Sequence, residues 1–447
     1  MNALRLGLLM LCGGLVLAVN AQGAEPKAGG DGLKPVQPPE TPRQWAPAVK
    51  PKELSENVKR GLAWLVKTQQ SGGSWGQGEE SKQMGNSMAT LTASPNLADT
   101  ALVTLAFLRA GHTPKAGEYA ATVRKAIGFI CGEIERSEGA AMFVTDLKGT
   151  RTQLKLGQYI DTFMTAMLLS ELREQMNDEA SAKRVAAAFH KVMDKIERNQ
   201  KPDGTWDGQG WAPVLQQGMA AKAINRAAQA GRDVPEEVRA RVEKFSGQQL
   251  ETKDGKVTLA GPPAAALAVG RAGDAAAVAP SAAGSAGVEL YAWAGNVSAL
   301  QEQENTNSGK ETQLRKDLET ASTEEDKKQI TETLSRYQHN REKLEAAQNA
   351  LVQRLADDRF VKGFGSNGGE EFLSYMNIGE SLVVAGGAAW EKWDRQITEN
   401  LSRIQNEDGS WTGHHCITGR TFCTAAALLV LTVDRAPVPV AAKIRRR

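Results

Sequence analysis

A tripeptide of glycine, a small hydroxyl residue and tryptophan occurs three times in this chain and constrains its fold more than any other feature. A glutamine stands six residues before each tryptophan, where an amphipathic helical pattern ends. Glycine suits a turn with positive φ, the glutamine amide can bond free backbone groups, and the indole can cover the helix end. The pattern predicts a repeated helix–loop–helix unit. The copies run from Gln69 to Trp75, from Gln200 to Trp206 and from Gln405 to Trp411.

The spacing of the copies predicts how many units the chain holds. Trp75 and Trp206 are 131 residues apart, which fits three helical hairpins of about 44 residues each. A degenerate fourth copy surrounds Asp254-Gly255, and further helix pairs lack the tryptophan. Six hairpins that close on themselves leave no end face to cap. We therefore expect an all-α fold over residues 53–435: a closed α/α toroid of about six helical hairpins, with charged outer helices and small, apolar inner ones.

The first copy also resembles a known family. Arg60-Gly61, Trp64-Leu65 and Gln69, followed by Gly73 and Trp75, are similar to the glutamine–tryptophan repeat of squalene and oxidosqualene cyclases. The same toroid occurs in the β subunits of protein prenyltransferases and in complement-type thioester domains. The resemblance implies the fold, whereas it says little about chemistry, because these repeats lie away from catalysis in the cyclases.

The two ends of the chain read differently from the repeats. Arg5, an apolar run from Leu6 to Val19 and the small-residue site ending at Ala21 predict a signal peptide over residues 1–21, and hence a periplasmic or extracellular protein. The run is shorter than the roughly 20 residues of a membrane-spanning helix, and no other run approaches that length, so no transmembrane span is expected after the signal is removed. Residues 22–52 are rich in Pro and Gly and predict a disordered tether. Residues 436–447 form a basic tail.

A charged segment over residues 296–356 interrupts the repeat. Ile330, Tyr337, Leu344 and Leu351 recur every seven residues, which predicts an antiparallel coiled-coil hairpin inserted in the toroid. This insertion is either an arm for a protein partner or for dimerisation, or a helical spur that extends two toroid helices. Both interpretations remain open.

The charge balance argues against one class of partner. The chain has 54 Lys and Arg against 52 Asp and Glu, a formal charge of +2. A nucleic-acid-binding protein usually shows a clear basic excess or stripe, so no nucleic-acid partner is expected.

Carboxylates at the starts of two inner helices are the candidate catalytic residues. The cyclase resemblance implies an Asp-x-Asp-Asp motif that protonates the substrate, and this sequence has none. Asp99 and Asp161, each followed by Thr, are weak substitutes. They are either acids facing a cavity or first-turn anions favoured by the helix dipole.

The segment from His414 to Cys423 is the candidate metal site. The prenyltransferase resemblance implies zinc held by Asp, Cys and His on successive inner helices, and thiolate and imidazole suit Zn²⁺. The expected Asp-x-Cys pair is replaced by Ser374-Tyr375-Met376-Asn377, so that set is incomplete. Export favours oxidation, and a helix starting near Arg420 would let Cys416 fold back. We therefore favour a Cys416–Cys423 disulfide over zinc held by His414, His415, Cys416 and Cys423.

The leading hypothesis is a toroid that binds a small-molecule or protein ligand through its central concave face. The alternatives are a terpene cyclase or prenyltransferase-like enzyme and an extracytoplasmic glycan lyase or hydrolase, whose paired carboxylates would act as acid and base. A centre filled with side chains would argue against both enzymes. The residues expected at a central cleft are Asp99, Asp161, Glu289, Tyr291, Trp293 and Tyr375, with Arg420 as a further ligand-binding candidate.

Overall fold

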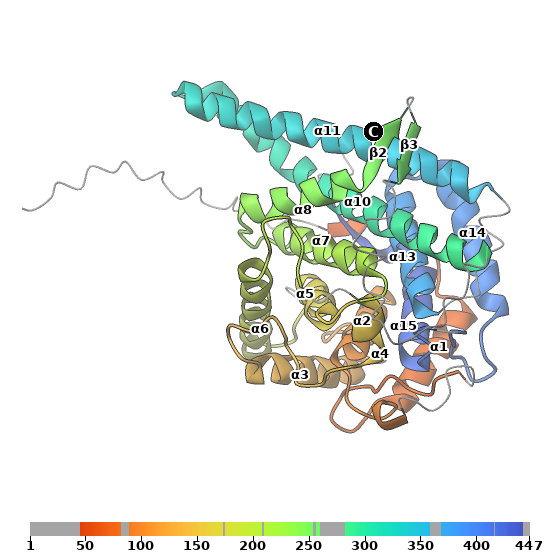
Figure 1. Ribbon diagram of the computed structural model, residues 1–447. Helices are drawn as coiled ribbons and strands as arrows, with labels where there is room; N and C mark the ends of the chain where they lie inside the picture. The colour runs from red at the N-terminus through yellow and green to blue at the C-terminus, as the bar shows by residue number, and fades with distance from the viewer. Residues whose placement is uncertain are drawn as a thin grey trace, which may run out of the picture. The chain divides into compact units, whose positions relative to one another are not determined.

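The computed structural model describes residues 45–81, 89–172, 175–207, 210–253, 256–259, 282–357, 368–414 and 416–440. α-Helices make up most of these residues, which confirms the all-α class (Figure 1). The strands that they contain form two short antiparallel pairs, and two 3₁₀ turns lie at Ala89–Leu91 and Val433–Arg435.

Six of the described helices, here called the central helices, are buried almost all round, except that the stretch from Gly309 to Thr320 in one of them is largely exposed. All thirteen residues of α5 are buried. Between its first and last turns, Leu, Met, Ala, Phe and Thr occupy every side of the helix, so it has no charged face to turn toward water. Each central helix contacts the next along the chain, and α15 contacts α2. The central helices are α2 (Leu97–Arg109), α5 (Ile160–Leu172), α7 (Pro213–Gln229), α10 (Ala282–Thr320), α13 (Gly369–Ala385) and α15 (Arg420–Leu431).

The remaining long helices are amphipathic and bury one face against the central helices. In α6, for example, buried apolar residues recur at helical spacing between Val185 and Ile196, and charged residues occupy the other face. These helices precede the central ones in the chain, as the hairpin pattern predicts. They are α1 (Glu56–Thr68), α3 (Ala120–Arg136), α6 (Glu179–Arg198), α8 (Glu236–Gln248), α11 (Glu324–Leu355) and α14 (Gly387–Arg403), and the short α4 (Arg151–Leu156) precedes α5.

The three tryptophans of the repeat cover helix ends, as the sequence predicts. Each indole is buried, and its Nε1 donates to the carbonyl oxygen ten residues earlier. Trp75 bonds Leu65 O at 2.8 Å, and the other two copies repeat the bond at 2.9 and 2.8 Å. The indole thereby bonds a carbonyl near the helix end that receives no backbone N–H of the helix.

The three glutamines join each loop to the outer helix of a following hairpin. Gln69 Nε2 donates to Thr122 O of α3 at 2.9 Å, and Gln200 Nε2 reaches the start of α8. Gln405 Nε2 donates to Asn57 O of α1 at 2.9 Å. The last loop therefore makes to the first helix the contact that the earlier loops make to later helices.

The predicted fourth copy differs from the expectation, and the predicted insertion takes one of its two expected forms. Strands β2 (Leu250–Lys253) and β3 (Lys256–Leu259) form a hairpin where the degenerate loop was expected, because Thr252, Val257 and Thr258 favour strand. Helices α10 and α11 pack against each other and run out past α8 (Figure 1). Their inner halves belong to the body of the fold, so the arm is a continuation of two helices rather than a separate insert.

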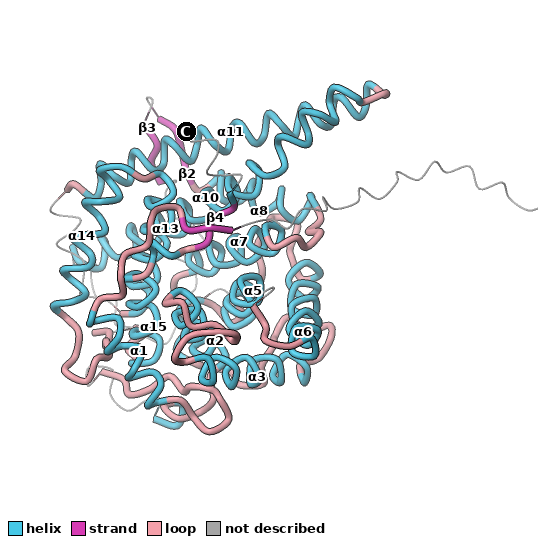
Figure 2. The backbone as a smooth tube through the Cα atoms, turned by 180° about the vertical axis from the view of Figure 1, so that it is seen from behind, coloured by secondary structure: helices cyan, strands magenta, loops and turns pink. Residues whose placement is uncertain are grey.

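Both ends of the described chain meet in a strand pair. β1 (Trp45–Pro47) pairs antiparallel with β4 (Pro437–Pro439), and the two lie side by side in Figure 2. The end of the predicted tether and the start of the predicted tail are therefore ordered. The predicted signal peptide, residues 22–44 and residues 441–447 lie outside the described residues. Across the described part of the chain, no helix combines the length and apolar character needed to cross a bilayer.

Candidate functional site

The central helices share one direction, so their first turns meet at one end. Ala98 N, at the start of α2, donates to Asp161 Oδ1 at the start of α5 at 3.1 Å. At their other ends, Arg109 Nη2 lies 2.6 Å from Glu171 Oε1. We call these the amino end and the carboxyl end of the central helices.

Four buried carboxyls gather at the amino end, and we call them the amino-end cluster. They are Asp99 of α2, Asp161 of α5, and Glu370 and Glu371 of α13, each no more than 2% exposed. All four lie in the first helical turn, where the free N–H groups and the helix dipole favour negative charge.

Asp99 and Asp161 are close enough to interact electrostatically, but they differ in their hydrogen bonds. Asp161 accepts from Gln153 Nε2 at 2.8 Å and from Ala98 N. Neither carboxyl oxygen of Asp99 has a hydrogen-bond partner among the described residues. Burial and the neighbouring Asp161 charge raise the pKa of Asp99 to about 8. At neutral pH, Asp99 is therefore a neutral acid. Burial also raises the pKa of Asp161, and its hydrogen bonds from Gln153 and Ala98 act against that rise.

Glu370 and Glu371 are the members of the cluster that sequence reasoning missed. Glu370 Oε2 accepts from Ile417 N at 3.1 Å, and burial raises the pKa of this carboxyl to about 7. Glu371 accepts from the Tyr375 hydroxyl. The signal was Gly-Gly-Glu-Glu directly before Phe372. Helix α13 begins at Gly369, before Phe372, so both acids lie in its first turn.

The aromatic candidates are buried at or near this end. Tyr375 touches the cluster through its bond to Glu371. Burial, with the charges of Glu370 and Glu371, raises the pKa of Tyr291, and its ring lies edge-on to Trp211 with centroids 6.2 Å apart. Trp293 is 5% exposed and its Nε1 has no partner among the described residues. These rings fill space between helices instead of lining an open cleft.

The predicted Cys416–Cys423 disulfide is wrong, because neither cysteine is in a disulfide. Helix α15 begins at Arg420 as expected, and Cys416 lies before it with a φ of 66°. This backbone turns the Cys416 thiol toward the Glu370 carboxyl, and the Cys423 thiol donates to Ile417 O at 3.5 Å. Burial raises the pKa of both thiols, to about 12 for Cys416. The two cysteines thus face separate partners in their neutral form.

The zinc hypothesis gains no support from the same segment. His414 is exposed, and its backbone carbonyl accepts from Ser81 Oγ at 2.9 Å. His415 lies outside the described residues. Within the described ranges, no three His, Cys, Asp or Glu side chains are placed to hold a metal ion.

Arg420 and Glu289 pair with residues outside the amino-end cluster. Arg420 Nη2 lies 2.6 Å from Asp408 Oδ2, and its guanidinium stacks 5.5 Å from the Trp64 ring. It therefore holds the loop of the third repeat. Glu289 Oε1 lies 2.7 Å from Arg354 Nε and ties α10 to α11.

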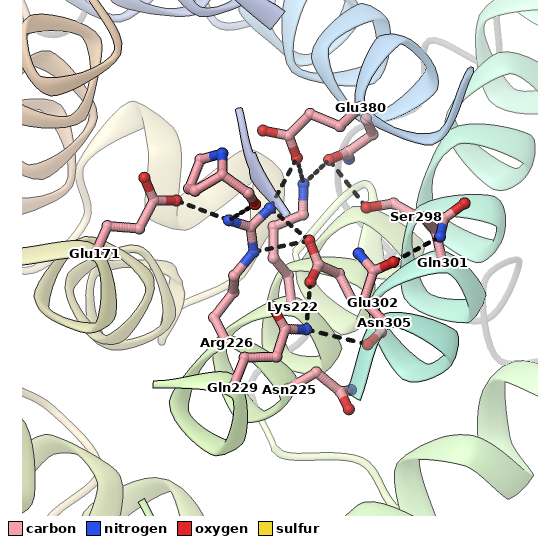
Figure 3. A network of polar contacts seen from close by, with 12 residues as sticks. Glu171, Lys222, Asn225, Arg226, Gln229, Ser298, Gln301, Glu302, Asn305 and Glu380 are labelled. Atoms are coloured by element: carbon pink, nitrogen blue, oxygen red, sulfur yellow. Dashed lines mark hydrogen bonds and ion pairs between the residues drawn. The ribbon is translucent and has the colours of Figure 1, made fainter. Parts of the chain in front are cut away.

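The middle of the fold is filled by paired charges, which we call the central network (Figure 3). Arg226 reaches three carboxylates: Glu302 at 2.7 Å, Glu171 at 3.1 Å and Glu380 at 3.8 Å. Lys222 Nζ lies 2.5 Å from Glu380 Oε2. Burial acts against ionisation, yet these cations and Arg109 lower the pKa of Glu380 to about 2. The members are Arg109, Lys222 and Arg226 with Glu171, Glu302 and Glu380.

The strand pair covers this network at the carboxyl end. Pro437 O of β4 accepts from Arg226 Nη1 at 3.1 Å. The Trp45 ring of β1 lies 5.6 Å from the same guanidinium, close enough for a cation–π interaction. The interior between the central helices is therefore occupied by side chains and closed by the two termini of the described chain.

An exposed apolar pair marks the rim of the amino end. Leu154 is 51% exposed and Trp211 is 52% exposed. Trp211 N donates to Leu154 O at 3.3 Å, and Lys155 Nζ lies 5.7 Å from the Trp211 ring. Leu154, Lys155 and Trp211, here called the rim patch, stand beside Tyr291 and thus beside the amino-end cluster.

Comparison of the chain with family models, characterised proteins and solved structures finds no match.

Replacing Asp99 with asparagine is expected to change how stability depends on pH. In the folded chain Asp99 keeps its proton up to about pH 8, whereas its ordinary pKa is 3.8. Folding therefore takes up a proton between these values, and stability falls as pH rises through that window. Asparagine does not titrate, so the variant lacks this fall in stability. Between pH 5 and pH 8, its free energy of unfolding should rise by at least about 2 kcal/mol relative to that of the natural chain.

Urea unfolding at pH 5 and pH 8 measures this difference. Two other titratable groups interact with Asp99, namely Asp161 of α5 and Cys423 of α15. Both residues are present in the natural chain and in the variant. Parallel stability profiles for the two proteins would contradict the assignment of a neutral Asp99.

Proposed function

We propose that this protein is an exported, closed α/α toroid of the squalene-cyclase type that binds a protein partner and does not transform a terpene. The toroid is supported by the order of contacts from α2 through α15 and back to α2. It is also supported by the hydrogen bond from Gln405 to Asn57 O. This bond joins the last loop to the first helix in the same way that Gln69 joins its loop to α3. Six outer and six central helices then make six hairpins.

The filled interior is the observation that carries the proposal. A cyclase needs a deep, mostly apolar cavity with a protected acid. Here Arg226, Lys222 and Glu380 occupy the middle with at most 8% of each side chain exposed. A glycan enzyme needs an open groove with a carboxylate on each side of the bond, and the amino-end carboxyls are buried. Binding is therefore assigned to the outside of the toroid.

The rim patch is the surface that we assign to the partner. Large apolar side chains that remain exposed together often mark a protein interface, and tryptophan is enriched among residues that dominate binding energy. Lys155 beside the Trp211 ring adds a charge that can orient an incoming surface. The neighbouring backbone bonds hold Leu154 and Trp211 together, so the patch is formed before binding.

Site-specific crosslinking tests the rim patch. A photo-reactive amino acid at position 211 is expected to capture a defined partner in cells that express the chain. The same amino acid at Ile404, which is 39% exposed at the end of α14, is the matched control. Capture of the same product from both positions, or from neither, would argue against the patch.

Product analysis tests the absence of terpene chemistry. Incubation with squalene, or with farnesyl diphosphate and a cysteine peptide in the presence of zinc, is expected to yield no product. A cyclised or prenylated product that disappears in the Asp99→Asn variant would overturn the proposal.

One observation favours a second candidate function, acid catalysis at the amino end. Asp99 carries a proton at neutral pH, and a positioned carboxylic acid can give that proton to a substrate. This function requires the loops over the amino end to open. Activity on a glycan substrate that falls at least about a hundredfold in Asp99→Asn, with folding retained, would support it.

A further inference from the structure

Two hollows lie on the outside of the fold between α3 and α6, away from the rim patch and the central network. The larger has a volume of about 460 Å³ and the smaller about 150 Å³. Both are lined by Gly128 and Arg184, so they adjoin at these residues. Together they reach the size of a small-molecule site.

Glycines on α3 create the space in the hollows. A Cβ added at Gly128 would meet nothing within 4 Å, and one at Gly132 would meet only the guanidinium ends of Arg136 and Arg184. Glycine inside a helix costs about 1 kcal/mol relative to alanine. The sequence therefore keeps two unfavourable residues, one turn apart, on a face where larger side chains would fit.

The two hollows differ in their chemistry. The charged side chains lining the larger one are all cations, namely Lys125, Arg136 and Arg184. Both arginines also pair with a carboxylate that does not line the hollow, Arg136 with Glu133 and Arg184 with Glu135. The smaller hollow has an apolar wall and, at its edge, the cation Arg124 and the anion Asp178. Its apolar wall consists of Ile127, Cys131, Met176 and Val185.

We propose that the α3–α6 hollows bind a free anionic amphiphile, a small molecule with a carboxylate or similar headgroup and a short apolar tail. The headgroup lies in the larger hollow against Lys125, Arg136 and Arg184, where charge-assisted hydrogen bonds form. The tail crosses Gly128 and lies against Met176 and its apolar neighbours, which removes the apolar surface of the tail from water. The inference is independent of the proposed function, because the hollows and the rim patch share no residue.

Binding of decanoate to the full chain tests this site, with calorimetry for affinity and the methyl ¹³C signal of Met176 for location. Decanoate is expected to bind and to shift that signal, and binding is expected to weaken as salt is added. The neutral analogue 1-decanol is expected to bind at least about tenfold more weakly, because it lacks the charge-assisted contact.

Gly128→Leu is the decisive variant, because it fills the junction of the hollows without removing any contact. Leucine is also the better helix former, so the variant should fold at least as well as the natural chain. Decanoate affinity is expected to fall at least about tenfold as the tail loses its space. Gly309→Leu makes the same change on an exposed, open face of α10 and is the matched control; its affinity should not change.

Arg184→Gln tests the headgroup and is expected to weaken binding by about two- to fivefold, as for an exposed ion pair. Three results would overturn the proposal: decanoate binding that survives Gly128→Leu, equal binding of decanol and decanoate, or no binding of decanoate while vesicles containing phosphatidylglycerol bind.

Discussion

Replacing Arg226 with methionine is expected to destabilise the fold by about 3–5 kcal/mol, the cost of removing one partner from a buried ion pair. Arg226 is 2% exposed and contacts Glu171, Glu302 and Glu380. Methionine has similar length but no charge, so three cations facing three carboxylates become two facing three. The contacts of Pro437 and Trp45 with the guanidinium are lost as well. Urea unfolding at neutral pH measures the change.

Lys183→Ala is the control for this experiment. Lys183 pairs with Glu179 at 2.6 Å, but both side chains are mostly exposed, so its loss should cost less than about 0.5 kcal/mol. If Arg226→Met costs as little as the control, the network does not hold the interior together and the centre is open to water.

Trp411→Ala is expected to destabilise the fold by about 3–5 kcal/mol, the usual cost of truncating a buried tryptophan. The Trp411 indole is buried and bonds Leu401 O at 2.8 Å, and Gly61 of α1 packs against its ring. Its loss therefore loosens the contact between the last and first hairpins as well as the helix end.

Trp206→Ala supplies the comparison that tests closure. Trp206 makes the same bond in the middle of the chain, to Ile196 O at 2.9 Å. In a closed toroid, the two substitutions cost about the same, because no hairpin is terminal. In an open array the last hairpin is frayed, and Trp411→Ala would cost clearly less than Trp206→Ala. Chemical unfolding followed by circular dichroism distinguishes the two results.

The sequence predicted the parts of the fold that local residues determine. The glutamine, glycine and tryptophan of each repeat act within about ten residues of one another, so their role in closing a helix end could be inferred from spacing alone. Helix α15 begins at Arg420, the start that would let Cys416 fold back. Asp99 and Asp161 were correctly placed at the starts of buried helices.

Interactions between distant residues could not be predicted in this way. Lys222 and Arg226 lie in a helix whose sequence is otherwise small and apolar, and their partners Glu302 and Glu380 follow 76 to 158 residues later. A single sequence does not show which distant charges meet. Glu370 was not among the predicted site residues, because the sequence did not show that α13 begins as early as Gly369. The predicted disulfide was wrong because the backbone at Cys416 directs its thiol to the Glu370 carboxyl.

The β1–β4 pair also sets the order in which the molecule can be completed. Trp45 pairs with Pro439, so the first described strand has no partner until the last one exists. During synthesis, Arg226 of α7 is made before two of its partners, Glu380 and then Pro437. Assembly of such a chain ends with its longest-range contacts and is correspondingly slow. A chain made from its amino terminus therefore cannot close this end of the fold before its last strand has been synthesised.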